Sequence, residues 1–346
     1  MSVTILDIAR EAGVSKSTVS LVINNSEKVR TDTHFKVRQA IEKLGYVPNQ
    51  AARQLIMKRT HTLGLIFFTY NHLDKAYAFS SVPETLLSNA SSVINLELFN
   101  SDYTLLTERF SLQRDSGSLP RIIKERRLDG VFLIGGILTD EFMKHIQELK
   151  LPSVIIGTQY EGLDSVSTDY EESGFMGLRY LIEHGKRKIL FVNGPKDSTT
   201  SQLKLRGVNR GLKFFHGKGI SLTAINSEHT GQAAYQCMKK YWEREEKPDA
   251  VFCGNNGISS GVIRFLYQLK LHIPEDVSVL TLEDSILTEY CTPPLTSIDT
   301  QSDLLGKEAC RMLLSRIKKP RSKTMALLLP PVLTERGSVL DADRMF

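Results

Sequence analysis

Residues 5–24 read ILDIAREAGVSKSTVSLVIN, and this stretch decides the fold of the first part of the chain. Its first half has apolar residues at Ile5, Ile8, Ala9 and Ala12. This helical spacing predicts a helix, with Thr4 as its N-cap and the acidic Asp7 in its first turn. Gly13 stands where the helix must end and the chain reverse, since glycine readily adopts the left-handed backbone of a helix terminus.

A second helix is predicted directly after this reversal, with Ser15 as its N-cap. The side chains expected on its inner face are Thr18, Val19, Val22 and Ile23. Lys16, Ser17 and Ser20 then face outward. Two short helices joined in this way form a helix-turn-helix, whose second helix is free to enter the major groove of DNA.

A third amphipathic helix is predicted, with Thr31 as its N-cap and Gly45 at its end. Its apolar set is Phe35, Val37, Ala40, Ile41 and Leu44. Three small helices then enclose one miniature core. Residues 49–56, which follow Pro48, offer two more helical turns capped by Asn49. So short a helix is expected to form only when something binds it.

Four motifs in this region carry a resemblance to a known family. They read DIA at residues 7–9, AGVSKSTVS at 12–20, KLGYVPN at 43–49 and AARQL at 51–55. In this order and at this spacing they resemble the lactose/galactose repressor (LacI/GalR) family of bacterial transcription regulators. The resemblance implies a DNA-binding head, a hinge helix and an effector-binding domain. Leu21 departs from it, because the family often has arginine at this position.

The DNA contacts implied by the second helix and the hinge are assigned as follows. Lys16, Ser17 and Ser20 are expected at base edges and phosphates, because an ammonium donates to guanine acceptors and a hydroxyl pairs with several bases. Leu55 resembles the family's hinge leucine, which wedges into the minor groove and bends the duplex. Its alternative role is packing inside the protein. The complete set expected to bind DNA is Thr4, Ser15, Lys16, Ser17, Thr18, Ser20, Asn24, Asn49, Ala52, Arg53 and Leu55.

The basic charge of the chain is confined to the same region. The 346 residues carry a formal net charge of +5, from 44 Lys and Arg against 39 Asp and Glu. Residues 1–60 hold ten of these cations and five of these anions, which leaves 34 of each in the remainder. A basic excess confined to a helix-turn-helix head favours the phosphate backbone of DNA as its partner. The alternative is a solvated basic face.

Cysteine spacing and the length of apolar stretches indicate the cellular compartment in which the protein works. The cysteines are Cys237, Cys253, Cys291 and Cys310. They form no C-x-x-C pair and lack histidines at ligand spacing, so reduced structural thiols are expected, with no metal and no cofactor. The first residues do not form a charged-then-apolar signal sequence, and no stretch approaches the ~18 apolar residues of a membrane span. A cytoplasmic protein without a membrane partner is expected.

After residue 60, short apolar runs alternate with stretches of helical periodicity. The runs are 64–68, 103–106, 130–134, 153–156, 188–193, 250–253 and 277–282. The helical stretches include 141–149, 174–184, 231–243 and 259–269. The alternation predicts parallel sheets flanked by helices. Two such sheets give a two-lobed α/β domain, an arrangement for which the family is known and which is similar to periplasmic sugar-binding proteins.

Domain boundaries are expected at polar and glycine-bearing stretches. The head covers residues 1–47, and the hinge helix and linker cover 48–60. The chain is expected to cross between lobes near 157–162 and again around 284–292. The resulting segments are 61–158 with 289–318 in the first lobe, and 159–288 with 319–340 in the second. A ligand cleft is expected between them, at the carboxyl ends of the strands.

The resemblance continues through both lobes and implies an effector site. In the family an arginine and a glycine near the start of a second-lobe helix face the effector, and Arg206 and Gly207 resemble them. The family's strand-end Asn-Asp pair is here residues 255–256, and its Asp-Asp turn is here residues 283–284. Such donors and acceptors suit a polyol, so a sugar or sugar derivative is expected. The effector set is Tyr70, Asp169, Arg206, Asn255 and Glu283.

These effector residues also have structural roles as alternatives. Arg206 suits an ion pair on a helix surface, and Asn255 suits a turn. Tyr70 belongs to a loop over residues 69–79 that is longer than the family's usual turn, and aromatic residues near strand ends also suit a core.

Together these features predict a sequence-specific DNA-binding transcription regulator, a repressor, controlled by a small polar metabolite. A homodimer with two heads on a two-fold axis would contact a pseudo-palindromic double-stranded operator. The first alternative is an extracytoplasmic solute-binding protein, against which the basic head and the missing signal sequence count. An enzyme is the second, and it lacks support because we find no nucleophile–base–acid set and no phosphate-binding glycine loop.

Overall fold

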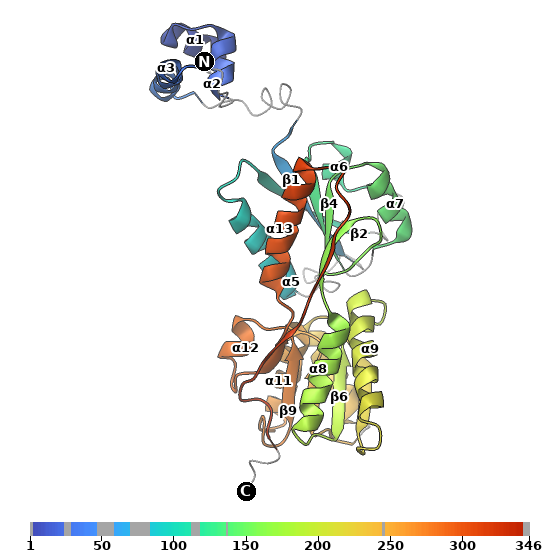
Figure 1. Cartoon of the computed structure of the whole chain (residues 1–346). Coiled ribbons are helices and arrows are strands. Elements are labelled where there is room, and N and C mark those ends of the chain that lie inside the picture. Colours follow the sequence, from blue (N-terminus) through green and yellow to red (C-terminus); the bar gives the residue numbers. More distant parts are fainter. Residues whose placement is uncertain are drawn as a thin grey trace. The chain divides into compact units, whose positions relative to one another are not determined.

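The computed structural model describes residues 3–23, 29–46, 59–69, 84–111, 118–135, 138–243 and 246–341. The chain divides into two compact units, Met1–Thr60 and His61–Phe346 (Figure 1). Each unit has its own apolar core. None of the helices in these ranges combines the length and the apolar character that crossing a bilayer requires.

The first unit is a helical head. Its described helices are α1 (Ile5–Ala12), α2 (Lys16–Ile23) and α3 (Thr31–Lys43). Thr4 caps α1 as predicted, because its Oγ1 accepts from the Asp7 N–H at 3.4 Å and the Asp7 carboxylate accepts in return from the Thr4 N–H at 2.9 Å. Gly13 ends α1 with a left-handed backbone (φ 64°). The buried core consists of Ile8, Ala9, Val19, Val22, Val37 and Ala40.

Two details of α3 differ from the prediction. Thr31 is already inside the helix, and the N-cap is Arg30, whose side chain makes no capping hydrogen bond. Phe35 is 63% exposed instead of buried. Val37 and Ala40 define the buried face, and a residue two positions before Val37 points about 200° away from it around the helix. The short helix predicted after Pro48 lies outside the described residues.

The second unit contains two sheets. In the described ranges sheet A has the order β11-β5-β4-β3-β1-β2, with every neighbouring pair parallel. Its strands are β1 (Thr62–Thr69), β2 (Thr104–Ser111), β3 (Gly130–Ile134), β4 (Ser153–Ile156), β5 (Asp164–Thr168) and β11 (Ala326–Leu329). The helices packed on it are α5 (Glu84–Leu98), α6 (Arg121–Lys124), α7 (Asp140–Glu148) and α13 (Ser302–Lys318). These elements make up the first lobe.

Sheet B has the order β12-β10-β9-β8-β6-β7, and β12 runs antiparallel to β10 while the other pairs are parallel. Its strands are β6 (Lys188–Asn193), β7 (Ser221–Asn226), β8 (Ala250–Cys253), β9 (Ser278–Leu282), β10 (Thr296–Asp299) and β12 (Val332–Thr334). Its helices are α8 (Tyr170–Glu183), α9 (Thr199–Phe214), α10 (Gly231–Trp242), α11 (Asn256–Gln268) and α12 (Ile286–Tyr290). These elements make up the second lobe.

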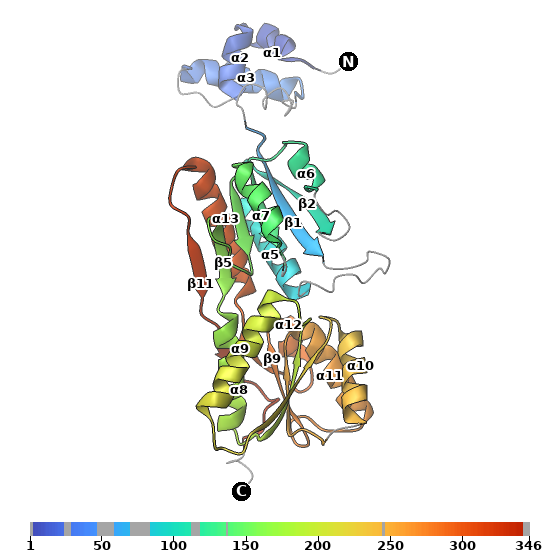
Figure 2. The ribbon, with the colours of Figure 1, turned by 90° about the vertical axis from the view of Figure 1, so that its right-hand side faces the viewer.

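Helices cover both faces of each sheet, because successive strand residues point to opposite sides. On sheet A, Phe67 packs with α5 and α13, while Ile66 packs with α7. On sheet B, Phe191 packs with α8 and α9, while Val192 packs with α10 and α11. Figure 2 shows α8 and α9 on one side of this sheet and α10 and α11 on the other. The alternation of predicted strands and helices therefore corresponds to two doubly covered sheets.

The chain passes between the sheets after Thr168, after Asp299 and after Leu329, so the predicted crossings need correction. Residues 159–168 belong to sheet A because β5 pairs with β4. The glycines near 157–162 serve the short β4–β5 connection, where Gly157 and Gly162 have positive φ angles of 91° and 83°. Residues 296–299 belong to sheet B, and residues 326–329 return to sheet A.

Candidate DNA-binding head and effector site

Helix α2 presents a polar surface held in place by two buried valines. Val19 and Val22 lie in the head core, with 0% and 2% exposure. Ser15 caps the helix as predicted, because its Oγ accepts from the Thr18 N–H at 3.1 Å. The same Oγ lies 2.7 Å from the Ser17 hydroxyl. Lys16 and Ser17 are exposed, and Ser20 is half-buried.

The head cations differ in how they are paired. Lys43 lies 2.7 Å from the Glu11 carboxylate, and Arg10 lies 3.9 Å from Asp7. Lys16, Arg30 and Lys36 make no ion pair with any described residue. The other residues predicted to contact DNA lie outside the described ranges, and these are Asn24, Asn49, Ala52, Arg53 and Leu55.

A second group of polar side chains is buried at the carboxyl ends of β6, β8 and β9. At its centre is Lys204, which is 1% exposed. Its Nζ donates to the Gly254 carbonyl at 2.7 Å and lies 5.3 Å from the centre of the Tyr170 ring. No carboxylate of the described residues lies within the 4.0 Å of an ion pair. Burial lowers the pKa of Lys204, and the more distant Glu283 carboxylate opposes this shift.

The packing of α8 against α9 places Lys204 inside the lobe. The buried residues of α9 are Thr200, Ser201, Lys204, Gly207, Val208 and Gly211. Gly207 allows the close approach, since a Cβ there would lie 1.8 Å from the Glu171 carbonyl oxygen. A Cβ on Gly174 would similarly lie 2.1 Å from the Lys204 carbonyl oxygen. The two glycines thus let the helices touch backbone to backbone, which fixes the direction of the lysine.

His229 lies beside Lys204 and is 6% exposed. The Asn255 side chain caps α11, because its Oδ1 accepts from the Ile258 N–H at 2.7 Å. Its Nδ2 therefore faces His229 Nδ1, 2.5 Å away, and donates to it. This assigns the ring proton to Nε2, which has no hydrogen-bond partner in the described part of the chain. Burial and the Lys204 charge lower the pKa of His229 to about 3, so the ring is neutral at pH 7.

Glu283 contributes a buried carboxylate to the same region. It is 6% exposed and follows β9 with an unusual φ of 128°, a backbone that favours glycine. Its Oε2 accepts from the Asn256 N–H at 3.3 Å. Burial, and then the charge of Glu283, raise the pKa of the Tyr170 phenol. The conformation is strained for a glutamate, which points to a constraint on this turn.

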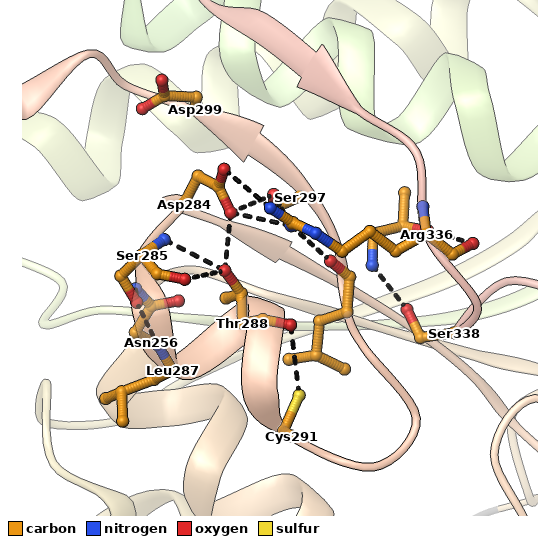
Figure 3. Close-up of polar contacts among 12 residues, drawn as sticks. Asn256, Asp284, Ser285, Leu287, Thr288, Cys291, Ser297, Asp299, Arg336 and Ser338 are labelled. Atoms are coloured by element: carbon orange, nitrogen blue, oxygen red, sulfur yellow. Dashed lines mark hydrogen bonds and ion pairs between the residues drawn. The ribbon is translucent and has the colours of Figure 1, made fainter.

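An ionic network holds the residue after Glu283 (Figure 3). Arg336 donates through both terminal nitrogens to the Asp284 carboxylate, at 2.8 and 3.0 Å. Thr288 and Ser297 donate hydroxyl hydrogen bonds to Asp284 Oδ1, at 2.6 and 2.9 Å. Burial alone would raise the pKa of Asp284, but the hydrogen bonds from Arg336, Thr288 and Ser297 lower it. The network joins the end of β9 to α12, β10 and the C-terminal segment.

The predicted effector residues fall in different places. Asn255 and Glu283 belong to the buried group described above. Asp169 caps α8, where its Oδ1 accepts from the Glu172 N–H at 2.8 Å. Arg206 lies away from the group: its side chain is 65% exposed and its Nε is 3.5 Å from Glu171. The surface ion pair considered as its alternative is therefore what the structure contains, and Tyr70 lies outside the described residues.

Lys204, His229 and Tyr170 were missed at the sequence level. The signal for Lys204 was its position three residues before Gly207 and seven before Gly211, which places it on the face of α9 that glycines bring against α8. Arg206 is two residues further along the helix and so points to the other side. His229 and Tyr170 carried no comparable signal, since a lone histidine or tyrosine is common in a core.

The buried group can bind a molecule through hydrogen bonds and charge, with an ammonium, an imidazole N–H and a carboxylate. No set of three His, Cys, Asp or Glu side chains in the described ranges is arranged to hold a metal ion. The cysteines at 237, 253, 291 and 310 are unpaired thiols, and burial raises the pKa of Cys310 to about 11.

Comparison with known proteins covers both units. Residues 4–49 match bacterial regulatory proteins of the lacI family, and residues 178–339 match the periplasmic binding protein-like domain. The chain is 31% identical to the HTH-type transcriptional repressor PurR of Vibrio atlanticus (strain LGP32), over 97% of this chain and 98% of the relative. It is 29% identical to the ribose operon repressor of Escherichia coli (strain K12), over 97% and 99%. The crystal structure of the lac repressor dimer bound to operator and the anti-inducer ONPF has a similar fold (TM-score 0.82, 23% identity, 98% of this chain and 100% of that chain).

Proposed function

Because this chain belongs to the LacI family of bacterial regulatory proteins, we propose that it is a sequence-specific DNA-binding transcriptional repressor controlled by a small polar metabolite. The observation that carries this proposal is that similarity to the repressor PurR extends over 97% of the chain, through the head and both lobes. The relatives reported above are regulators, and none is named as an enzyme.

For the domain organisation, we propose a head over residues 1–47, a hinge over 48–60 and an effector domain in two lobes. The first lobe comprises 61–168 and 301–329, and the second comprises 169–300 and 330–340. The sheet membership of β5, β10 and β11 supports these limits. A cytoplasmic location fits a regulator that must reach DNA.

Helix α2 is the proposed recognition helix. Its exposed Lys16 and Ser17 are free to approach base edges and phosphates, while Val19 and Val22 anchor it to the head. Thr4, Ser15, Thr18 and Ser20 support or flank this surface. The proposed set also includes Asn24, Asn49, Ala52, Arg53 and Leu55.

The effector site is proposed at the buried group of the second lobe. Lys204 takes the role that the sequence suggested for Arg206, since the lysine is buried and the arginine is on the surface. His229 and Glu283 supply a donor and an acceptor. Asn255 acts through His229 by fixing its tautomer. Asp169 and Tyr70 remain predictions.

A homodimer on a pseudo-palindromic operator is proposed because one head spans only a half-site. The effector would act by changing how the lobes meet, and a coupling of ~1–3 kcal/mol between the two sites suffices to alter operator occupancy severalfold.

Gel retardation tests the proposal: the full-length protein is mixed with sheared genomic DNA from an organism that produces it. Selective retention of a few fragments is expected. Lys16→Ala should weaken retention, whereas the charge-matched Lys239→Ala, on an exposed position of α10, should not. Equal retention of all fragments, or of none, would argue against a sequence-specific regulator.

A further inference from the structure

Among the described residues, the buried ammonium of Lys204 has no direct counter-ion. Its described polar contact is the Gly254 carbonyl at 2.7 Å, and no carboxylate in the described ranges lies within 4.0 Å. An ammonium has three N–H donors, so two are left after this contact. Taking such a charge out of water is strongly unfavourable unless another group compensates it. Glu283 acts on Lys204 only from beyond ion-pair distance and accepts instead from the Asn256 N–H.

Two further donors lie beside Lys204 without partners in the described chain. They are the Nε2–H of His229 and the hydroxyl of Ser201, which are 6% and 1% exposed as residues. Both border Gly194: a Cβ there would lie 2.4 Å from His229 Cε1 and 2.5 Å from Ser201 Oγ. Ser201 precedes Lys204 by three residues on α9, so their side chains lie on the same face.

We propose that the effector is an organic anion that also carries hydroxyl groups, with its carboxylate or phosphate bound by Lys204 and His229 and a hydroxyl donating to Glu283. This inference rests on the proposed function, and it narrows the ligand class from sugars in general to acidic sugar derivatives or hydroxy acids. Ser201 adds a third donor to the acidic group.

An anion fits this group better than a neutral polyol for an electrostatic reason. A hydroxyl oxygen can accept from Lys204, but it leaves the buried charge uncompensated. A carboxylate or phosphate compensates the charge and forms charge-assisted hydrogen bonds, which are about twice as strong as neutral ones. The tautomer of His229 favours the same choice. Its Nε2–H can only donate a hydrogen bond, and an ionised carboxylate or phosphate oxygen can only accept one.

The first experiment measures the Tm of the full-length protein with sodium phosphate, sodium acetate or glycerol, at constant ionic strength set by sodium chloride. Phosphate or acetate is expected to raise the Tm of the wild-type protein by a degree or more, while glycerol produces the same change in all variants. Lys204→Met should remove the anion effect, and Lys239→Met, at an exposed lysine of α10, should retain it. Acetate and phosphate together distinguish a carboxylate site from a phosphate site.

The ligand-free proteins provide a second readout. Lys204→Met should have a Tm several degrees above the wild type, because it removes an uncompensated buried charge and keeps the apolar stem. A lysine that only stabilises the fold would give the opposite shift.

The anion proposal is overturned if neither salt raises the wild-type Tm above the chloride reference, or if Lys204→Met responds like the wild type. Gel retardation with the same wild-type preparation separates this result from a failure of the proposed function. Selective DNA binding without an anion effect would reject only the ligand class. An anion effect without selective DNA binding would reject the regulator and leave the site.

Discussion

Replacing Arg336 by methionine should destabilise the effector domain more than any change to its surface ion pairs. Arg336 and Asp284 are 16% and 21% exposed at their side chains, and two parallel hydrogen bonds of 2.8 and 3.0 Å join them. Arg336 also donates to the Leu295 carbonyl at 2.8 Å. Methionine fills a similar volume but supplies none of these donors, so the Asp284 carboxylate stays buried with two hydroxyl donors only.

Removing one partner of a buried, hydrogen-bonded ion pair typically costs about 3–5 kcal/mol. Asp284 keeps the Thr288 and Ser297 hydroxyls, so we expect the lower part of this range, about 3 kcal/mol. For a domain of this size that corresponds to a fall in Tm of roughly 6–12 °C. The exposed pair of Arg179 with Glu183, at 55% and 50% exposure, is the control. Arg179→Met should change the unfolding free energy by less than about 0.5 kcal/mol.

Urea denaturation of the variants at several pH values checks this prediction. The hydrogen bonds lower the pKa of folded Asp284 below its unfolded value of about 3.9. Their stabilisation is therefore fully present above that pH and is lost as the pH falls through the folded pKa. The difference between wild type and Arg336→Met should be largest at pH 7 and shrink toward pH 3. A loss below about 1 kcal/mol at pH 7, or one that grows in acid, would refute the reasoning.

Three further outcomes are expected. DNA affinity should fall steeply with salt, with a log–log slope on the order of −5 to −10 for a dimer, and a slope near zero in binding titrations would contradict the electrostatic part of the proposal. Leu55→Ala should weaken operator binding by ~1–3 kcal/mol while changing non-specific binding much less; equal losses on operator and random fragments would assign Leu55 to packing. Gly207→Ala should lower the unfolding free energy by about 1–3 kcal/mol, because its Cβ would overlap the Glu171 carbonyl oxygen; a Tm equal to that of the wild type would show that α8 and α9 are not in close contact.

The three described helices of the head could be predicted from sequence because their determinants are local. The capping pair of Thr4 with Asp7 and the left-handed Gly13 act within a few residues of one another. The errors in α3 came from treating Phe35 as part of the apolar face, although its direction around the helix differs from that of Val37. A hydrophobic residue that is close in sequence to the buried face of a helix does not necessarily belong to that face.

The lobe boundaries depended on pairings between distant segments, which local patterns do not reveal. Strand β5 reads DSVST, so it lacks the apolar run that marks its neighbours as strands. Its partner β11 comes from near the end of the chain, and no local pattern indicates this pairing. The choice of the cation in the candidate site depended on a smaller difference along the chain. Choosing Arg206 in place of Lys204 moved the proposed cation by two residues, which on a helix exchanges the interior for the surface.

The repeated passage of the chain between sheets has a consequence for its synthesis. Sheet A receives β11 from residues 326–329, and its core includes Leu305, Leu313 and Leu329. Both lobes receive a last strand from the C-terminal segment. Among the described elements, a chain made up to residue 300 lacks only β12 of the second lobe, whereas it lacks both α13 and β11 of the first lobe. We expect the second lobe to become resistant to protease first on stalled ribosomes, although it comes later in the sequence. Protection of the first lobe in chains stalled before residue 300 would contradict this order.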